Sequence, residues 1–325
     1  MKKYNKIVLS VLAALLVVVL AACGNDDAPA TQDTPDTPAT QDTNETTDAP
    51  AGDDFVIALI TMDSIDQHWI ALREGADEVA AAEGVTLNFM SPAEKDDAQQ
   101  IQEVLNAVAA GVDAIVIAAN HPEAISGALQ SAVDAGIVVV YVDSPANVPA
   151  EATFSTDNVA AGASAGEALL AALTDAGVTT GDIGIISVNP GTQSTVDRDE
   201  GFRSVFAGTD FTILETQFAD GDAARSQNYA TNFITLGVVG LFGANEGSSV
   251  GVGNAIREAG GTVLGGGFDA SGAIMNLIED GYLVFTTAQD PVNMGRMGVQ
   301  AAINALRNGP SLNGAVQDTG AQILR

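Results

Sequence analysis

The chain has 325 residues, of which 42 are Asp or Glu and 12 are Lys or Arg, giving a formal net charge of −30 at pH 7. This negative charge argues against nucleic acid as a partner, because phosphates require basic patches, and against electrostatic attachment to anionic lipid. The only cysteine is Cys23, which excludes an intramolecular disulfide and a multi-cysteine metal site.

The first 22 residues are typical of a secretory signal. Lys2, Lys3 and Lys6 precede an apolar stretch over 7–20 that is too short for a comfortable membrane span. The stretch ends in small residues before Cys23, which resembles the lipobox of bacterial lipoproteins, where the cysteine is lipidated and becomes the mature N-terminus. We expect a signal peptide over 1–22 and a lipid anchor at Cys23. An ordinary signal peptide with an incidental cysteine is the alternative.

The segment that follows has the composition of a solvated tether. Residues 24–53 are rich in Asp, Thr, Pro, Ala and Gln and contain no Lys, Arg or aromatic residue, so they cannot build a hydrophobic core. We expect a disordered tether over 23–53. Beyond it, Lys95 is the only lysine left in the mature chain.

Residues 54–325 alternate between short apolar runs and amphipathic segments. The first series predicts strands at 55–61, 85–90, 114–118 and 137–142, and helices at 68–82, 98–110 and 123–135. The second series predicts strands at 183–188, 211–218, 238–242, 263–268 and 283–287, and helices from 158 to 176 and at 196–206, 223–236, 248–259 and 292–307. Two such series predict an α/β protein of two lobes, each a doubly wound parallel sheet flanked by helices.

Ligands of such sheets bind beyond the carboxyl ends of the strands, and polar residues recur there. They are Asp66, His68 and Trp69, then Asp143 with Ser144, Asn245, Asp269 and Gln289. Carboxylates accept from hydroxyls, and amides both donate and accept, as a polyhydroxylated solute requires. Trp69 suits stacking on a sugar face, or it packs beneath its helix. Each polar residue taken alone could instead be a turn or a helix cap.

The order of several short motifs resembles the ribose- and galactose-type periplasmic sugar-binding proteins of bacterial ABC importers. The motifs are Asp66-Gln67-His68-Trp69, Tyr141-Val142-Asp143, Ser155-Thr156-Asp157-Asn158, Arg198-Asp199-Glu200-Gly201-Phe202, Asn245-Glu246, Gly267-Phe268-Asp269 and Thr286-Thr287-Ala288-Gln289. The resemblance implies a type I periplasmic binding protein, with one lobe over 54–157 and 290–318 and the other over 158–289 and 319–325. A hinge of three crossings, near 156–157, 289–290 and 318–319, would let the lobes close on a ligand.

The same resemblance implies a set of ligand-binding residues. They are Asp66, His68, Trp69, Asp143, Ser144, Arg198, Asn245, Asp269 and Gln289. Ribose binders carry arginine where this chain has Ser144 and Val196, and an aromatic residue where it has Gly221. The expected ligand is therefore a monosaccharide or polyol that need not be ribose, and a cationic solute stays open.

The sequence favours binding over catalysis. The mature chain has no Gly-Lys step for a phosphate-binding loop, and His68 and His121 are too far apart to suggest a zinc motif. We expect no enzymatic activity, no cofactor and no metal. The expected partners are an ABC permease with its ATPase, and the membrane through the anchor, with the protein itself a monomer. A sensor subunit presenting its ligand to a membrane receptor or kinase, and an exported enzyme, are the alternatives.

Overall fold

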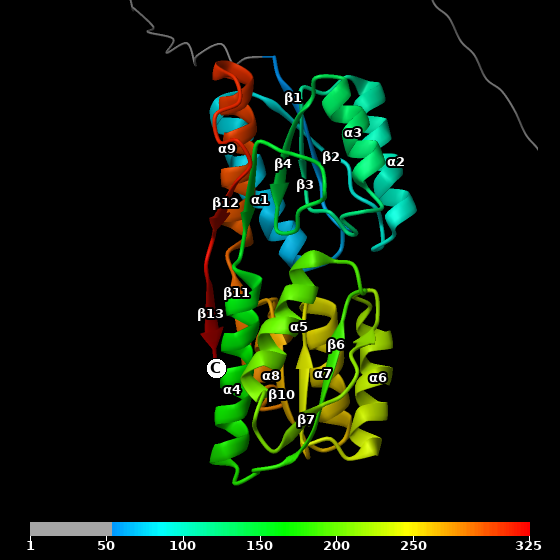
Figure 1. Ribbon diagram of the computed structural model, residues 1–325, viewed down its shortest axis with the longest axis vertical. Helices are drawn as coiled ribbons and strands as arrows, with labels where there is room; N and C mark the ends of the chain where they lie inside the picture. Colours follow the sequence, from blue (N-terminus) through cyan, green and yellow to red (C-terminus); the bar gives the residue numbers. More distant parts are fainter. Residues whose placement is uncertain (1–53) are drawn as a thin grey trace, which may run out of the picture. The chain divides into compact units, whose positions relative to one another are not determined.

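The computed structural model describes residues 54–325 (Figure 1). The predicted signal peptide, the anchor at Cys23 and the tether lie outside the described residues. Two sheets organise the described part, one of six strands in the order β12-β5-β4-β3-β1-β2 and one of seven in the order β13-β11-β10-β9-β6-β7, with β8 beside β6. All pairs are parallel except β13 with β11. The predicted fold class is confirmed.

The first lobe is built on the six-stranded sheet. Its strands are β1 (Val56–Ile60), β2 (Thr86–Phe89), β3 (Ala114–Ile117), β4 (Val138–Val142), β5 (Ala152–Ser155) and β12 (Ala315–Asp318), and its helices are α1 (Gln67–Glu83), α2 (Asp97–Ala110), α3 (Ser126–Asp134) and α9 (Pro291–Asn308). One apolar core joins α1 and α9 to one face of the sheet, and a second joins α2 and α3 to the other. Strands covered on both faces explain the continuous apolar runs in the sequence.

The second lobe repeats this plan on the seven-stranded sheet. Its strands are β6 (Gly181–Ser187), β7 (Phe211–Ile213), β8 (Gln217–Phe218), β9 (Gly240–Gly243), β10 (Leu264–Phe268), β11 (Phe285–Gln289) and β13 (Ala321–Leu324), and its helices are α4 (Asn158–Asp175), α5 (Gln193–Phe206), α6 (Ala223–Leu236), α7 (Glu246–Glu258) and α8 (Gly272–Glu279). Helices α4 and α5 cover one face, and α6, α7 and α8 cover the other. None of the helices described for 54–325 is long and apolar enough to cross a bilayer.

The chain passes between the sheets at the three predicted places. It leaves β5 at Ser155 for α4, leaves β11 at Gln289 for α9, and passes from β12 to β13 between Asp318 and Ala321. The crossings contact one another, because the Asp157 N–H donates to Asp318 Oδ1 at 2.9 Å and Thr156 Oγ1 lies 2.8 Å from Gln289 Oε1. The domain bounds themselves stay a prediction.

Three features differ from the predicted elements. The single strand expected over 211–218 is two short strands, β7 and β8, which pair with β6 at separate registers. Helix α8 was not predicted, although Ser271 caps it by accepting from the Ile274 N–H. Strands β5, β12 and β13 also went unpredicted, and the last two, at sheet edges, carry exposed and half-buried side chains instead of an apolar run.

Candidate functional site

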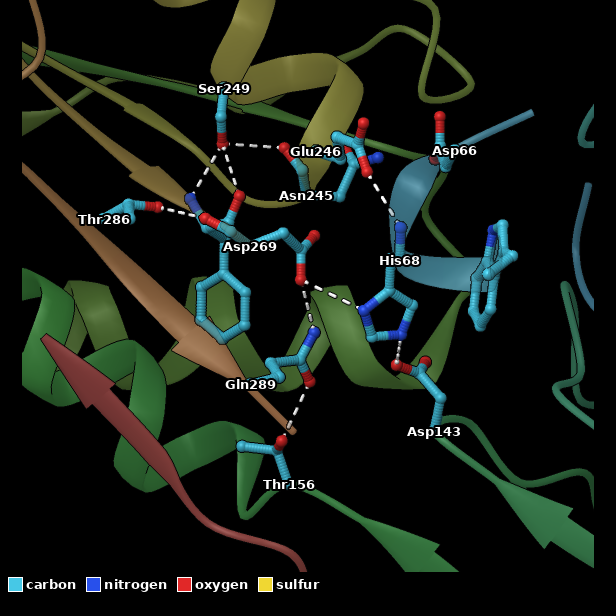
Figure 2. Close-up of polar contacts among 12 residues, drawn as sticks. Asp66, His68, Asp143, Thr156, Asn245, Glu246, Ser249, Asp269, Thr286 and Gln289 are labelled. Carbon is cyan, nitrogen blue, oxygen red and sulfur yellow. Dashed lines mark hydrogen bonds and ion pairs between the residues drawn. The ribbon is translucent and has the colours of Figure 1, made fainter. Parts of the chain in front are cut away.

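The candidate site lies where the carboxyl ends of the two sheets face each other. Asp143 follows β4 of the first lobe, Asp269 follows β10 of the second, and Gln289 ends β11. Both aspartates have left-handed backbones, with φ of 60° and 72°, a conformation that is uncommon outside glycine and tends to occur at functional positions. Figure 2 shows both carboxylates pointing toward the imidazole of His68.

His68, near the start of α1, joins the two carboxylates. Its Nε2 lies 3.0 Å from Asp143 Oδ2 and its Nδ1 lies 3.4 Å from Asp269 Oδ1, and all three side chains are buried. Burial acts to lower the pKa of His68, but the two carboxylates outweigh it and raise that pKa from 6.5 to about 10. Burial acts to raise the pKa of Asp269, yet the His68 charge lowers it to about 2. An imidazolium therefore bridges the two lobes at neutral pH.

Gln289 connects Asp269 to the crossings. Its Nε2 donates to Asp269 Oδ1 at 2.7 Å, and its Oε1 accepts from Thr156 Oγ1 at 2.8 Å (Figure 2). The same Oε1 also accepts from Arg198 Nη2 at 3.0 Å. These partners fix which end of the amide is the donor. The site and the crossings thus share one hydrogen-bond network.

Arg198, on α5, reaches the site. Its side chain is buried with the guanidinium 3.8 Å from the centroid of the Phe268 ring and 3.9 Å from Asp143 Oδ2. Other guanidinium nitrogens donate to Asn158 Oδ1 at 2.8 Å and to the Ala244 carbonyl at 2.9 Å. Burial lowers the pKa of Arg198, although the neighbouring aspartates oppose this shift. Most of its donors are therefore held by the protein itself.

Some of the other predicted site residues line the inner cavity, and some make structural contacts within the protein. Trp69 is packed in the first lobe's core and its Nε1 donates to Asp63 Oδ2 at 3.1 Å, while it also lines the inner cavity. Asn245 caps α7 through Ser248 and lines the same cavity. Ser144 is buried, and its Oγ accepts from the Ser194 N–H at 3.4 Å instead of lining the cavity. Asn245 therefore caps a helix and also lines the cavity, and its contact with a ligand stays a prediction.

Three charged residues near the site were not predicted to belong to it, namely Asp63, Lys95 and Glu246. Lys95 Nζ donates to Asp63 and to Asp66 Oδ2, the latter at 2.6 Å, and its side chain is 5 % exposed. Glu246 Oε2, at the start of α7, accepts from the His68 N–H at 3.0 Å across the lobes. Burial, and next the Asp66 charge, raise the Glu246 pKa to about 7. The sequence signals were that Lys95 is the only lysine after Cys23 and that Glu246 stands in the motif Asn245-Glu246.

Several spaces lie between the lobes, and two of them adjoin at His68. The inner cavity, of about 20 Å³, is lined by Asp66, His68, Trp69, Lys95, Arg198 and Asn245 among others, and holds roughly one water. A larger space of about 340 Å³ opens beside it between α1 and the starts of α7 and α8. His68, Asp269 and Gln289 line both spaces. Those three residues therefore separate the inner cavity from the cleft mouth.

Comparison with known proteins places the chain in one family. A family model described as a periplasmic binding protein domain matches residues 57–310. The ribose import binding protein of Bacillus subtilis is 27% identical over 256 residues, covering 78% of this chain and 82% of that protein. The D-allose-binding periplasmic protein of Escherichia coli is 26% identical over 278 residues, covering 81% and 88%.

Solved structures agree with this placement. An ABC transporter solute-binding protein from Agrobacterium vitis with bound D-fucose is 30% identical with a TM-score of 0.77, covering 83% of this chain and 94% of that one. A carbohydrate transporter solute-binding protein from Agrobacterium radiobacter in complex with D-arabinose is 28% identical with a TM-score of 0.79 and the same coverage. The chain belongs to the periplasmic binding protein family.

Proposed function

We propose that this protein is the extracytoplasmic binding component of an ABC importer, and that it captures a monosaccharide or polyol between its lobes. The observation that carries the proposal is the convergence of Asp143 from one lobe and Asp269 from the other on a single point occupied by His68. A solute at that point would contact both lobes at once, so its binding energy would favour their closure.

The groups around the cleft suit hydroxyls. Asp143 and Asp269 accept hydrogen bonds, Asn245 and Gln289 can donate and accept, and Arg198 donates. The mouth of about 340 Å³ is within the usual range for small-molecule sites. The inner cavity of about 20 Å³ is too small for a sugar, so the lobes must separate for a ligand to reach it. Relatives that bind ribose, allose, arabinose and fucose support a monosaccharide as the ligand.

A catalytic reading finds no support in the described residues. Two Gly-x-Ser-x-Gly sequences occur, at 162–166 and 247–251, but both lie within helices, α4 and α7. A nucleophile elbow instead requires a sharp turn between a strand and a helix. The family is one of transport components that bind and release their ligand unchanged.

Calorimetric titration tests the pocket directly. We expect the wild type to bind at least one of D-ribose, D-allose, D-arabinose, D-fucose and D-tagatose, and Asp269→Ala and Asn245→Ala each to weaken binding by about 100-fold or more, because buried charged or amide partners are lost. Glu258→Ala, at an exposed position of α7, is the control and should bind as the wild type does. Thermal unfolding checks that each variant is folded. Unchanged affinity in both pocket variants would reject the site.

We further propose that the folded part is held at the membrane by lipid on Cys23 and acts there as a monomer. The excess of acidic residues in the mature chain supports a covalent anchor, since electrostatic attraction to anionic lipid would be lacking. Delivery to a membrane permease would then require no diffusion away from the surface.

A further inference from the structure

The proposed function gives no role to Lys95, yet this residue lines the inner cavity. It lies between β2 and α2 in the first lobe, and its side chain is 5 % exposed. A lysine is seldom buried without partners. Here the partners are Asp63 and Asp66, from the loop between β1 and α1. Burial acts to lower the pKa of Lys95, but the charges of Asp66 and then Asp63 outweigh it, so that pKa is raised.

The loop that holds Lys95 is itself fixed in place. Asp63 is 1% exposed; its Oδ1 accepts from the Ile65 and Asp66 N–H groups at 2.8 and 2.9 Å, and its Oδ2 accepts from Trp69 Nε1. The ammonium of Lys95 therefore rests on a preformed carboxylate support. Its position is set by the fold and does not depend on a flexible side chain finding a partner.

The donor count leaves Lys95 with capacity for a ligand. An ammonium has three N–H donors, and two of them are taken by Asp63 and Asp66. The third has no acceptor among residues 54–325, and Lys95 lines the inner cavity, which a ligand would reach when the lobes separate. Arg198 has five N–H donors, and three of its nitrogens already donate to protein oxygens. Both cations of the pocket thus keep donor capacity for a ligand.

The side chain of Lys95 also lies beside Gly221 of the other lobe. Gly221 lies between β8 and α6, and a Cβ built on it would stand 2.9 Å from Lys95 Cδ and 3.0 Å from both Cε and Nζ. A lysine end would ordinarily move aside, but this one is held by two carboxylates. A side chain at position 221 would therefore clash with Lys95 in its present position. The two residues belong to different lobes.

We propose that Lys95 determines which sugar this protein selects: its ammonium donates to an oxygen of the bound ligand, and its stem against Gly221 sets the extent of the pocket on that side. The proposal rests on the proposed function, since it assigns a role within the same site. It predicts that Lys95 affects the ratio of affinities among sugars, and a purely structural residue would weaken all of them by one factor.

The test compares Lys95→Met with Arg225→Met, in which an exposed ion pair is lost, by calorimetric titration with the five sugars named above. Lys95→Met should weaken the best ligand by about 10- to 100-fold, the range for a hydrogen bond to a charged group, and change its ratio to the second-best sugar by about 10-fold or more. Arg225→Met should change neither the affinities nor their ratios.

A second pair of variants keeps the charge and tests the stem. Gly221→Ala places a methyl group against Lys95, and Gly237→Ala, with φ of 87° and nothing within 4 Å of its Cβ position, imposes similar backbone strain on the other end of α6. Both should lower the melting temperature, but only Gly221→Ala should change the sugar ratios. Because Gly221→Ala retains both carboxylates and the ammonium, it remains informative if Lys95→Met fails to fold.

The outcomes separate the two proposals. If the wild type binds a sugar, and Lys95→Met and Gly221→Ala leave the ratios of sugar affinities unchanged, the role of Lys95 is overturned. The proposed function then still stands. A folded wild type that binds none of these sugars and no polyol overturns both. Altered ratios in both variants and normal ratios in both controls support the assignment.

Discussion

At the scale of single residues, the molecule places a cation where a ligand is expected. The His68 imidazolium stands between Asp143 and Asp269 (Figure 2), and Glu246 accepts from its backbone N–H. Among residues 54–325, these two buried carboxylates would otherwise have only Arg198 and Gln289 as side-chain partners. A sugar that enters this space must therefore satisfy the same oxygens with its hydroxyl donors.

The pH dependence of stability should follow His68. Its pKa is raised from 6.5 to about 10, so its ion pairs contribute fully below pH 6.5 and are lost as pH rises through 10. Asp269, with its pKa lowered from 3.8 to about 2, contributes above pH 3.8 and stops contributing as pH falls through 2. We expect His68→Gln to lower the free energy of unfolding by about 3 kcal/mol at pH 6 and by much less at pH 10.

Urea unfolding at the two pH values measures this difference. His121→Gln is the matched control, because the His121 ring accepts only from backbone N–H groups, at 3.3 and 3.4 Å. Equal losses at pH 6 and pH 10 in His68→Gln would show that the ring contributes by packing and not by charge.

At the scale of elements, helix α1 is capped by the opposite lobe. Its N-cap residue, Asp66, makes no side-chain capping bond, because that carboxylate is held by Lys95. The orphan N–H of His68 is satisfied by Glu246, which lies in the first turn of α7. A helix in one lobe thus receives its cap only when the lobes meet, which couples helix capping to closure.

Glu246→Ala should weaken sugar binding by removing this cap. Loss of a cap costs about 1 kcal/mol, which corresponds to about a five-fold rise in Kd. Glu246→Gln keeps an acceptor oxygen and removes a charge that burial disfavours, so it should bind at pH 8 at least as tightly as the wild type. Calorimetry of both variants checks the interpretation; a glutamine variant as weak as the alanine variant would contradict the cap.

The sequence predicted most helices and strands well, but it missed β5, β12, β13 and α8 and most of the tertiary contacts. Strand β3 could be predicted because all four of its residues are buried and apolar, whereas β12 and β13 lie at sheet edges with polar or exposed residues. Asp143, Asp269 and Gln289 could be predicted from their places after strands. Lys95 could not, since it reaches the site only because β2 and α2 fold beside the loop that carries Asp63.

At the scale of the whole molecule, charge and anchoring should act separately. The chain beyond Cys23 holds all 42 acidic residues but only one lysine and eight arginines, so anionic lipid should repel it. Each buried acyl CH₂ contributes about 0.8 kcal/mol to membrane binding, so the proposed lipid on Cys23 would supply the attachment that charge does not.

Cys23→Ser should therefore release the protein completely from the membrane fraction, even at low ionic strength. Immunoblotting of membrane and soluble fractions measures the release, and incorporation of labelled palmitate measures the modification itself. Wild-type protein that takes up no label, or a serine variant that stays with the membrane, would refute the anchor.

The meeting of the three crossings at Thr156 has a practical consequence. Its hydroxyl lies within hydrogen-bond distance of Gln289 Oε1 and of the Gly320 carbonyl, at 2.8 and 3.4 Å, while Gln289 also holds Asp269. In a biosensor built on this protein, a substitution at these positions would therefore change both the extent of lobe movement and the affinity for the ligand. Substitutions meant to change only the amplitude of the signal are better placed on surfaces far from Thr156.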